Sequence, residues 1–299
     1  MTPDVSVIIP TYNRRAMLPE AIDSVLAQSN QSFELIVVDD GSTDGSAENL
    51  ARLGQTIRFE RIDHCGPASA RNRGVAMARA PLIAFLDSDD LWAPTKLERQ
   101  LAFMRANLDC AISQTNEIWI RNGRRVNPGL RHRKRAGDIF IDSLRTCLIS
   151  MSATMMRTEL FRSLTGFDES MLAAEDYDLW LRILIGHEAG LLDESLVTRR
   201  AGHPDQLSAT TPALDRFRIL ALTKLLAYDR LSPARRTAVV EVLVEKCRVY
   251  AGGLTRRGRI DQARLYESVA EQAQTCRATE IGCAINSIRS TLREVAYEH

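Results

Sequence analysis

Three aspartates lie within four positions in the stretch "FLDSDDLW", residues 85–92. They follow an apolar run directly, and an unpaired carboxylate is too costly to bury without a partner. A strand that brings Asp87, Asp89 and Asp90 to one edge of a sheet therefore predicts a bound cation at that edge. The alternative is a solvated turn in which Asp90 caps the following helix.

Two further acid pairs have the residue types and positions for chemistry. Asp39 and Asp40 end the apolar run "FELIVVDD", and Glu175 with Asp176 opens the segment "EDYDLWLR". A carboxylate of the second pair could act as a general base if a hydroxyl lies beside it. The first pair could instead form an ordinary turn that uses Asp and Gly for its backbone geometry. The second pair could simply be acids favoured in a first helical turn by the helix dipole.

The elements that must position these acids alternate between strand and helix patterns over the first hundred residues. "VSVIIP", a helical period in "LPEAIDSVLAQ" and "FELIVVDD" form a βαβ unit. A helix from about Asp44, a strand "IRFERI", a helix "ASARNRGVAMARA" and a strand "LIAFLDSDD" follow. Strands that are apolar almost throughout predict a parallel sheet covered on both faces, whose ligands bind beyond the carboxyl ends of the strands.

The remainder of the chain has a different organisation. A helix is expected over residues 96–108, strand segments in "CAISQTNEIWI", and a surface loop at residues 121–135, where seven Lys or Arg and one His occur without an acid. Beyond about Thr211 only helical periods remain. We therefore expect a first domain at residues 1–210 and a helical region at 211–299, whose apolar positions predict a buried face, as at Leu220, Leu222, Leu225 and Leu226.

Composition excludes several classes of protein. The 299 residues are 45% hydrophobic with a net charge of +1, which indicates a globular chain and argues against a nucleic-acid partner. The six cysteines, at 65, 110, 147, 247, 276 and 283, show no paired spacing, which favours a reducing compartment. No signal peptide or membrane-spanning run is evident, so we expect a cytoplasmic protein that could rest at the inner face of the membrane.

Five motifs together resemble those of one enzyme family. "VSVIIPTYNR", "VVDDGSTDGS", "ARNRG", "LDSDD" and "GFDESMLAAEDYDLWLR" occur in the order and spacing of the family 2 glycosyltransferases with the GT-A fold, over roughly residues 5–208. The resemblance implies a GT-A type nucleotide-binding sheet flanked by helices, with the helical appendage outside it. It also implies inverting, metal-dependent transfer of a sugar from a nucleotide diphosphate donor, usually UDP-linked, to a hydroxyl acceptor.

The resemblance also implies roles for individual residues. Asp176 would be the general base, and Glu175 would orient the acceptor. Contacts with the nucleotide-sugar would come from Pro10, Thr11, Tyr12, Asp39, Asp40, Arg71, Asp87 and Ser88, and ligands of Mg²⁺ or Mn²⁺ from Asp89, Asp90 and His203. Which two of the three aspartates of "DSDD" act is left open, Arg71 and His203 could be plain surface residues, and His64 is a further candidate for a donor contact.

Two rival functions and several partners stay open. A sugar-phosphate nucleotidyltransferase usually begins with a glycine-rich segment, which "IIPTYNRR" lacks. A catalytically inactive nucleotide-sugar-binding protein would not need both Asp89 and Asp176. The acceptor could be a glycan or a lipid-linked glycan. Peripheral membrane contact through residues 121–135 and a homo-oligomer formed through the helical tail are further expectations.

Overall fold

The computed structural model describes residues 2–46, 50, 57–202, 213–228, 230–275 and 284–291. The chain divides into two compact units. The first unit consists of Met1–Ile139, Cys147–Glu169 and Gly186–Gln206, and the second of Phe140–Thr146, Ser170–Ile185 and Leu207–His299. Two short segments before residue 210 thus group with the helical C-terminal region, while the domain boundary itself stays a prediction.

A single sheet forms the centre of the first unit. Its nine strands, counted over the described residues, run in the order β3-β2-β1-β4-β8-β6-β9-β5, and β7 pairs with β6. The pairs among β1, β2, β3 and β4 are parallel, and β8 joins antiparallel to β4. The bounds are β1 (Val5–Thr11), β2 (Phe33–Asp39), β3 (Arg58–Arg61), β4 (Leu82–Phe85), β5 (Leu91–Trp92), β6 (Ile112–Arg121), β7 (Arg124–Val126), β8 (Thr154–Arg157) and β9 (Ala189–Ala201).

The strand register brings the acid motifs to one edge of this sheet. All seven residues of β1 are buried, as expected of a central parallel strand. Thr11 at the end of β1 pairs with Asp39 at the end of β2, and Ile8 pairs with Phe85 at the end of β4. The residues that follow β1, β2 and β4 therefore emerge at the same carboxyl edge.

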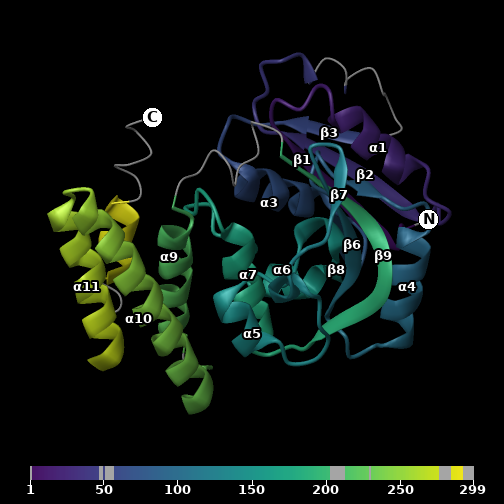
Figure 1. Ribbon diagram of the computed structural model, residues 1–299. Helices are drawn as coiled ribbons and strands as arrows, with labels where there is room; N and C mark the ends of the chain where they lie inside the picture. The colour runs from purple at the N-terminus through teal and green to yellow at the C-terminus, as the bar shows by residue number, and fades with distance from the viewer. Residues whose placement is uncertain are drawn as a thin grey trace. The chain divides into compact units, whose positions relative to one another are not determined.

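Helices flank the sheet in the first unit: α1 (Leu18–Leu26), α3 (Pro67–Met77), α4 (Lys96–Ala106) and α6 (Thr158–Ser163) (Figure 1). Helix α3 approaches β1 closely at Gly74, where a Cβ atom would lie 2.4 Å from Ile8 Cγ2. Only glycine allows this approach without a shift. The helix expected from Asp44 onward runs largely through residues 47–49 and 51–56, which lie outside the described residues.

The stretch 121–135, expected to be a surface loop, begins instead with a β-hairpin. Asn122 and Gly123 have φ angles of 49° and 74°, and Arg121 pairs with Arg124 across the turn. An Asn-Gly dipeptide favours a tight hairpin because both residues tolerate positive φ. The expectation of a loop over the whole stretch was wrong for β7, because the local turn chemistry outweighs the charged composition.

The second unit is helical, with α5 (Phe140–Arg145), α7 (Glu175–Leu184), α9 (Asp215–Leu226), α10 (Pro233–Arg256) and α11 (Ile260–Thr275), and α9, α10 and α11 lie side by side (Figure 1). Buried Asp178 of α7 accepts a hydrogen bond from Arg182 Nε at 2.9 Å and lies 2.6 Å from Lys224 Nζ of α9. The helical C-terminal region that the sequence predicts is thus present. None of the described helices is long and apolar enough to cross a membrane.

Removal of the helical region should destabilise what remains. A chain that ends at Ser208 lacks α9 and α10, whose buried side chains include Phe217, Leu220 and Leu243 and pack with α7 and α5. Each such side chain contributes about 1.5–3 kcal/mol by burial, against a typical total stability of about 5–15 kcal/mol. We expect aggregation or a changed assembly state in size-exclusion chromatography. A truncated protein of unchanged stability and assembly would contradict this expectation.

Candidate active site

The carboxylate of Asp39 is completely buried at the end of β2. The N–H of Ser42 donates to both carboxylate oxygens at 3.3 Å, and Arg61 Nε lies 3.5 Å from Oδ2. These partners hold a charge that would otherwise be costly to bury. Pro10 and buried Thr11 end the adjacent strand β1, so the first two predicted motifs meet at this edge.

Asp40 organises the loop that precedes α3. Its Oδ1 accepts the N–H of Cys65 at 2.8 Å, and its Oδ2 accepts the N–H of Gly66 at 2.9 Å and lies 2.8 Å from His64 Nδ1. The His64 imidazole stacks on the ring of Tyr12, with centroids 4.0 Å apart and planes inclined by 17°. Tyr12 is 40% exposed, so a flat aromatic pair faces solvent beside the acids, and such surfaces can stack a nucleobase.

The turn at residues 87–90 is held by hydrogen bonds to residues that are distant in the sequence. The N–H of Asp90 donates to Asp87 O at 2.9 Å, and the N–H of Asp87 donates to Ser152 Oγ at 3.1 Å. The Ser152 hydroxyl in turn donates to Asp90 Oδ2 at 2.6 Å, while Asp90 Oδ1 accepts the N–H of Arg200 at 2.9 Å. Burial, together with the neighbouring carboxylates of Asp89 and Asp87, raises the pKa of Asp90 well above its usual range.

Trp92 and Lys96 are buried and pack beneath the same turn. Trp92 Nε1 donates to the carbonyl oxygen of Ser152 at 2.8 Å. Lys96 Nζ lies 3.7 Å from the centroid of the Trp92 ring and has no hydrogen-bond partner among the described residues. Complete burial lowers the pKa of Lys96 well below its usual value. Contact with the ring face therefore takes the place of hydration for this amine.

Asp87 and Asp89 remain half-buried, unlike Asp90. Asp87 Oδ1 accepts a hydrogen bond from Arg71 Nη2 at 2.8 Å, and the Arg71 guanidinium lies 5.7 Å from the centroid of the Phe167 ring. Ser88 between the two aspartates is buried. The structure thus brings together Arg71 of α3 and Asp87, which follows β4.

The donor set of this turn fits a hard divalent cation. Mg²⁺ in nucleotide sites typically takes one or two carboxylates, and phosphates and water supply its other ligands. Asp89 and Asp87 offer such carboxylates, whereas both oxygens of Asp90 already accept hydrogen bonds. Among the described residues, no three His, Cys, Asp or Glu side chains gather as a metal site. His203, a predicted ligand, lies outside the described residues.

Asp90→Asn should preserve both the turn and metal-dependent nucleotide binding. An amide can still accept from the Arg200 N–H and can face Ser152 with its own donors, while it removes a buried charge. Asp90→Ala should instead destabilise the fold by about 1–3 kcal/mol for each buried group left without a partner. Denaturant unfolding and calorimetry with UDP and Mn²⁺ measure both effects. If Asp90→Asn folds normally but loses metal-dependent binding, Asp90 is itself a ligand.

The predicted base and its neighbour belong to the second unit. Glu175 is buried and Asp176 is half-buried in the first turn of α7, where Asp176 Oδ1 accepts the N–H of Tyr177 at 2.7 Å. Ala174, directly before the helix, has a φ of 58°. A left-handed conformation at a residue other than glycine costs of the order of 1–3 kcal/mol and is often found at functional sites. The start of α7 thus carries local backbone strain, as do Thr165 and Ala213 among the described residues.

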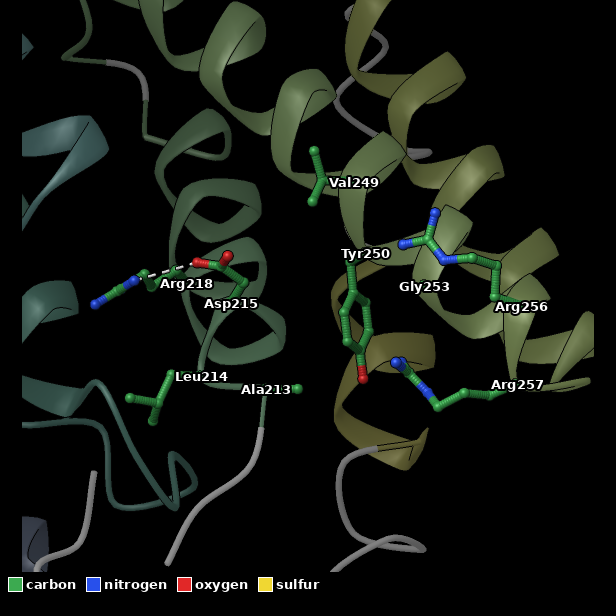
Figure 2. Close-up of a pocket in the computed structure, with 9 residues that line it drawn as sticks. All are labelled: Ala213, Leu214, Asp215, Arg218, Val249, Tyr250, Gly253, Arg256 and Arg257. Carbon is green, nitrogen blue, oxygen red and sulfur yellow. Dashed lines mark hydrogen bonds and ion pairs between the residues drawn. The ribbon is translucent and has the colours of Figure 1, made fainter. Parts of the chain in front are cut away.

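A separate pocket of about 330 Å³ lies within the second unit (Figure 2). Its acid, Asp215, accepts hydrogen bonds from Lys246 Nζ at 3.0 Å and Arg218 Nη1 at 3.2 Å. Burial opposes ionisation of Asp215, but these two cations outweigh it and lower its pKa. The lining contains none of the predicted site residues and consists of Ala213, Leu214, Asp215, Arg218, Val249, Tyr250, Gly253, Arg256 and Arg257.

Two solved structures are similar to this chain in fold. The crystal structure of S. aureus TarS 1–349 in complex with UDP-GlcNAc matches with a TM-score of 0.68 at 18% identity, covering 97% of this chain and 91% of that one. A mannosyltransferase, PcManGT from Pyrobaculum calidifontis in complex with GDP-Man and Mn²⁺, matches with a TM-score of 0.56 at 16% identity, covering 94% and 87% of the two chains. The predicted GT-A fold, with its sheet flanked by helices, is confirmed.

Similarity in sequence identifies the family of this chain. An uncharacterized glycosyltransferase of Rickettsia felis is 38% identical over 194 residues, which cover 64% of this chain and 32% of the relative. The chain thus spans about a third of that relative's length. The sequence profile of Glycosyl transferase family 2 matches residues 6–165. Because this match extends over more than half of the chain, the protein belongs to glycosyl transferase family 2.

Proposed function

We propose that this protein is a glycosyltransferase that moves a sugar from a nucleotide diphosphate donor to a hydroxyl acceptor with inversion, and that the donor is UDP-linked. The observation that carries the proposal is the meeting, at one sheet edge, of the Tyr12–His64 stack, buried Asp39 and the fastened turn at 87–90. Membership of the family supports a transferase, and S. aureus TarS, the closer in fold of the two structures compared, was solved with UDP-GlcNAc.

The donor would be held along this edge. The Tyr12–His64 stack offers a face for the base, and completely buried Asp39 would hold the end of β2 beside it through Ser42 and Arg61. Asp87, paired with Arg71, would contact the ribose, and Asp89 would be the principal protein ligand of Mg²⁺ or Mn²⁺. A divalent cation, when bound, neutralises the charge that develops on the departing diphosphate.

Inversion requires a base on the acceptor side of the sugar. A single displacement at the anomeric carbon needs a carboxylate opposite the leaving group to take the proton of the acceptor hydroxyl. We assign this role to Asp176 and the orientation of the acceptor to Glu175. The strained Ala174 supports the assignment, because it fixes the direction in which the first turn of α7 starts.

Release of nucleotide diphosphate, measured with and without an acceptor across a panel of nucleotide sugars with Mn²⁺, tests the proposal. A transferase releases UDP faster when acceptor is present. An inactive nucleotide-sugar-binding protein would bind the nucleotide sugar without cleaving it, so no UDP would be released. A sugar-phosphate nucleotidyltransferase would instead release pyrophosphate from a nucleoside triphosphate, and either result would overturn the proposal.

Location and assembly remain proposals of the same kind. We propose a cytoplasmic enzyme that contacts the inner membrane face through the part of residues 121–135 around Leu130 and associates with a second copy through its helical tail. Leu130, 86% exposed within the basic stretch, supports the membrane contact, since an exposed apolar side chain among cations suits an anionic bilayer surface. Flotation with anionic vesicles and light scattering would test the two ideas separately.

A further inference from the structure

One face of the strands β7, β6 and β9 gathers cations around a tryptophan. Arg121 pairs with Arg124, and Trp119 pairs with both Val126 and Arg199. Paired residues share a sheet face, and so do residues two apart on one strand. Trp119, Arg121, Arg124 and Arg199 therefore lie on one face, which we name the basic sheet face.

Two arginines of the basic sheet face, Arg121 and Arg124, have no ion pair with any of the described residues. Like charges placed directly opposite each other, as in the Arg121–Arg124 pair, destabilise a sheet. Both arginines are exposed. The nearby acid is Glu117, whose side chain is 3% exposed and lies 3.5 Å from Lys134 Nζ. The arginines of this face could therefore bind an anion that is not part of the chain.

The tryptophan at the centre of this face is held in a fixed orientation. Trp119 Nε1 donates to Glu117 Oε2 at 2.9 Å. The Arg199 guanidinium lies 4.9 Å from the centroid of the Trp119 ring, and the His132 ring centroid lies 5.3 Å from it. Aromatic rings and arginines that are set on strands form a more precise site than the same residues on a loop.

The basic sheet face is tied to the segment that fastens the candidate active site. Lys134, which neutralises Glu117, donates to Leu148 O at 3.1 Å and also to Ser150 Oγ. Ser150 lies two residues before Ser152, whose hydroxyl binds Asp90. A ligand on this face would therefore be linked, through Glu117 and Lys134, to the segment that positions the acids of the turn.

We propose that the basic sheet face binds the acceptor, and that the acceptor is a glycan whose sugars carry carboxylate or phosphate groups. This inference rests on the proposed glycosyltransferase function. Arginine suits both anions because its planar guanidinium can donate two parallel hydrogen bonds to either group. A membrane surface would need no oriented ring. The residue best suited to enter a bilayer, Leu130, lies in the short helical turn Leu130–His132 and not on these strands.

Calorimetry on the full chain tests this with three probes, namely tetragalacturonate, a glycerol phosphate trimer and neutral maltotetraose. At least one acidic probe should bind about tenfold or more tightly than maltotetraose, with an affinity that falls as salt is added. Whichever acidic probe binds more tightly identifies the anion. In Arg121→Gln/Arg199→Gln the affinity for that probe should fall by about tenfold or more, as expected for lost charge-assisted hydrogen bonds.

Three further variants serve as controls. Arg79→Gln removes an exposed arginine before the amino end of β4 and should leave the affinity unchanged. Leu130→Ser should likewise leave it unchanged. Trp119→Phe keeps an aromatic ring but loses the N–H that Glu117 accepts, so the affinity should fall with the fold intact.

Several outcomes would overturn the inference. Equal binding of acidic and neutral probes, or full affinity in the double arginine variant, would remove the acidic-glycan site. Binding of phosphatidylglycerol vesicles that the double variant loses, without any glycan binding, would make the face a membrane contact instead. Metal-dependent UDP binding, measured in the same preparations, distinguishes failure of the proposed function from failure of this inference. If the wild-type protein does not bind UDP, the proposed function is refuted. If it binds UDP but no glycan, only this inference is refuted.

Discussion

Asp89→Ala should weaken metal-dependent UDP binding by on the order of 100-fold or more, because it removes the principal carboxylate that would share the cation with the diphosphate. The fold should survive the change. Asp89 is only half-buried, and the turn is held by the bonds of Ser152 to its neighbours Asp87 and Asp90. Calorimetry with UDP and Mn²⁺, alongside thermal unfolding, separates the loss of binding from a loss of structure.

The matched control for this experiment is Asp109→Ala, which removes an exposed aspartate between α4 and β6 and should leave binding unchanged. EDTA added to the wild-type protein should reproduce the effect of Asp89→Ala. UDP binding that persists at full strength both in EDTA and in the Asp89 variant would show that the turn does not hold a cation. The residues of the turn would then act only through hydrogen bonds with the donor.

The sheet and its acid edge could be predicted because each strand is indicated by a short, continuous pattern in the sequence. The runs ending at Thr11, Asp39 and Phe85 are almost entirely apolar and do not alternate regularly with polar residues, which indicates strands buried on both faces. Residues that follow parallel strands must emerge at one edge, so the meeting of the acid motifs follows from strand order alone.

The partners of those acids could not be predicted in the same way. Ser152 binds Asp90 across 62 positions of sequence, and His64 reaches Asp40 across 24. No local pattern marks a serine for such a role, because its position depends on how β8 is placed beside β4. The hairpin at Asn122–Gly123 is a different case, since its dipeptide was a sufficient indication and the basic composition of the stretch obscured it.

The buried ion pairs show the same limit of sequence reasoning in the second unit. The apolar period of the C-terminal region predicts that one helix face is buried. It does not predict that Lys224 of α9 meets Asp178 of α7 at 2.6 Å. That contact joins the helix that carries Asp176 to the C-terminal helices, so the stability of α9 and the position of the proposed base are linked through one carboxylate.

Asp176→Asn should lower the rate of sugar transfer by about 10²–10⁴-fold, the loss typical of removing a positioned general base. Asparagine keeps the size of the side chain but lacks the basic oxygen. A second interpretation, in which Asp176 only supports the first turn of α7, predicts a different result. In that case the rate survives, and stability falls by only about 0.3–1 kcal/mol through the lost interaction with the helix dipole.

The control that separates these interpretations is Asp261→Asn, which changes an exposed aspartate in the first turn of α11. If the helix dipole were the whole effect, both variants should lose similar stability and keep full transfer. If Asp176 is the base, only Asp176→Asn loses transfer, while metal-dependent UDP binding stays at its wild-type strength in both. Near wild-type transfer in Asp176→Asn would therefore end the base assignment, and loss of UDP binding in that variant would place Asp176 among the donor contacts instead.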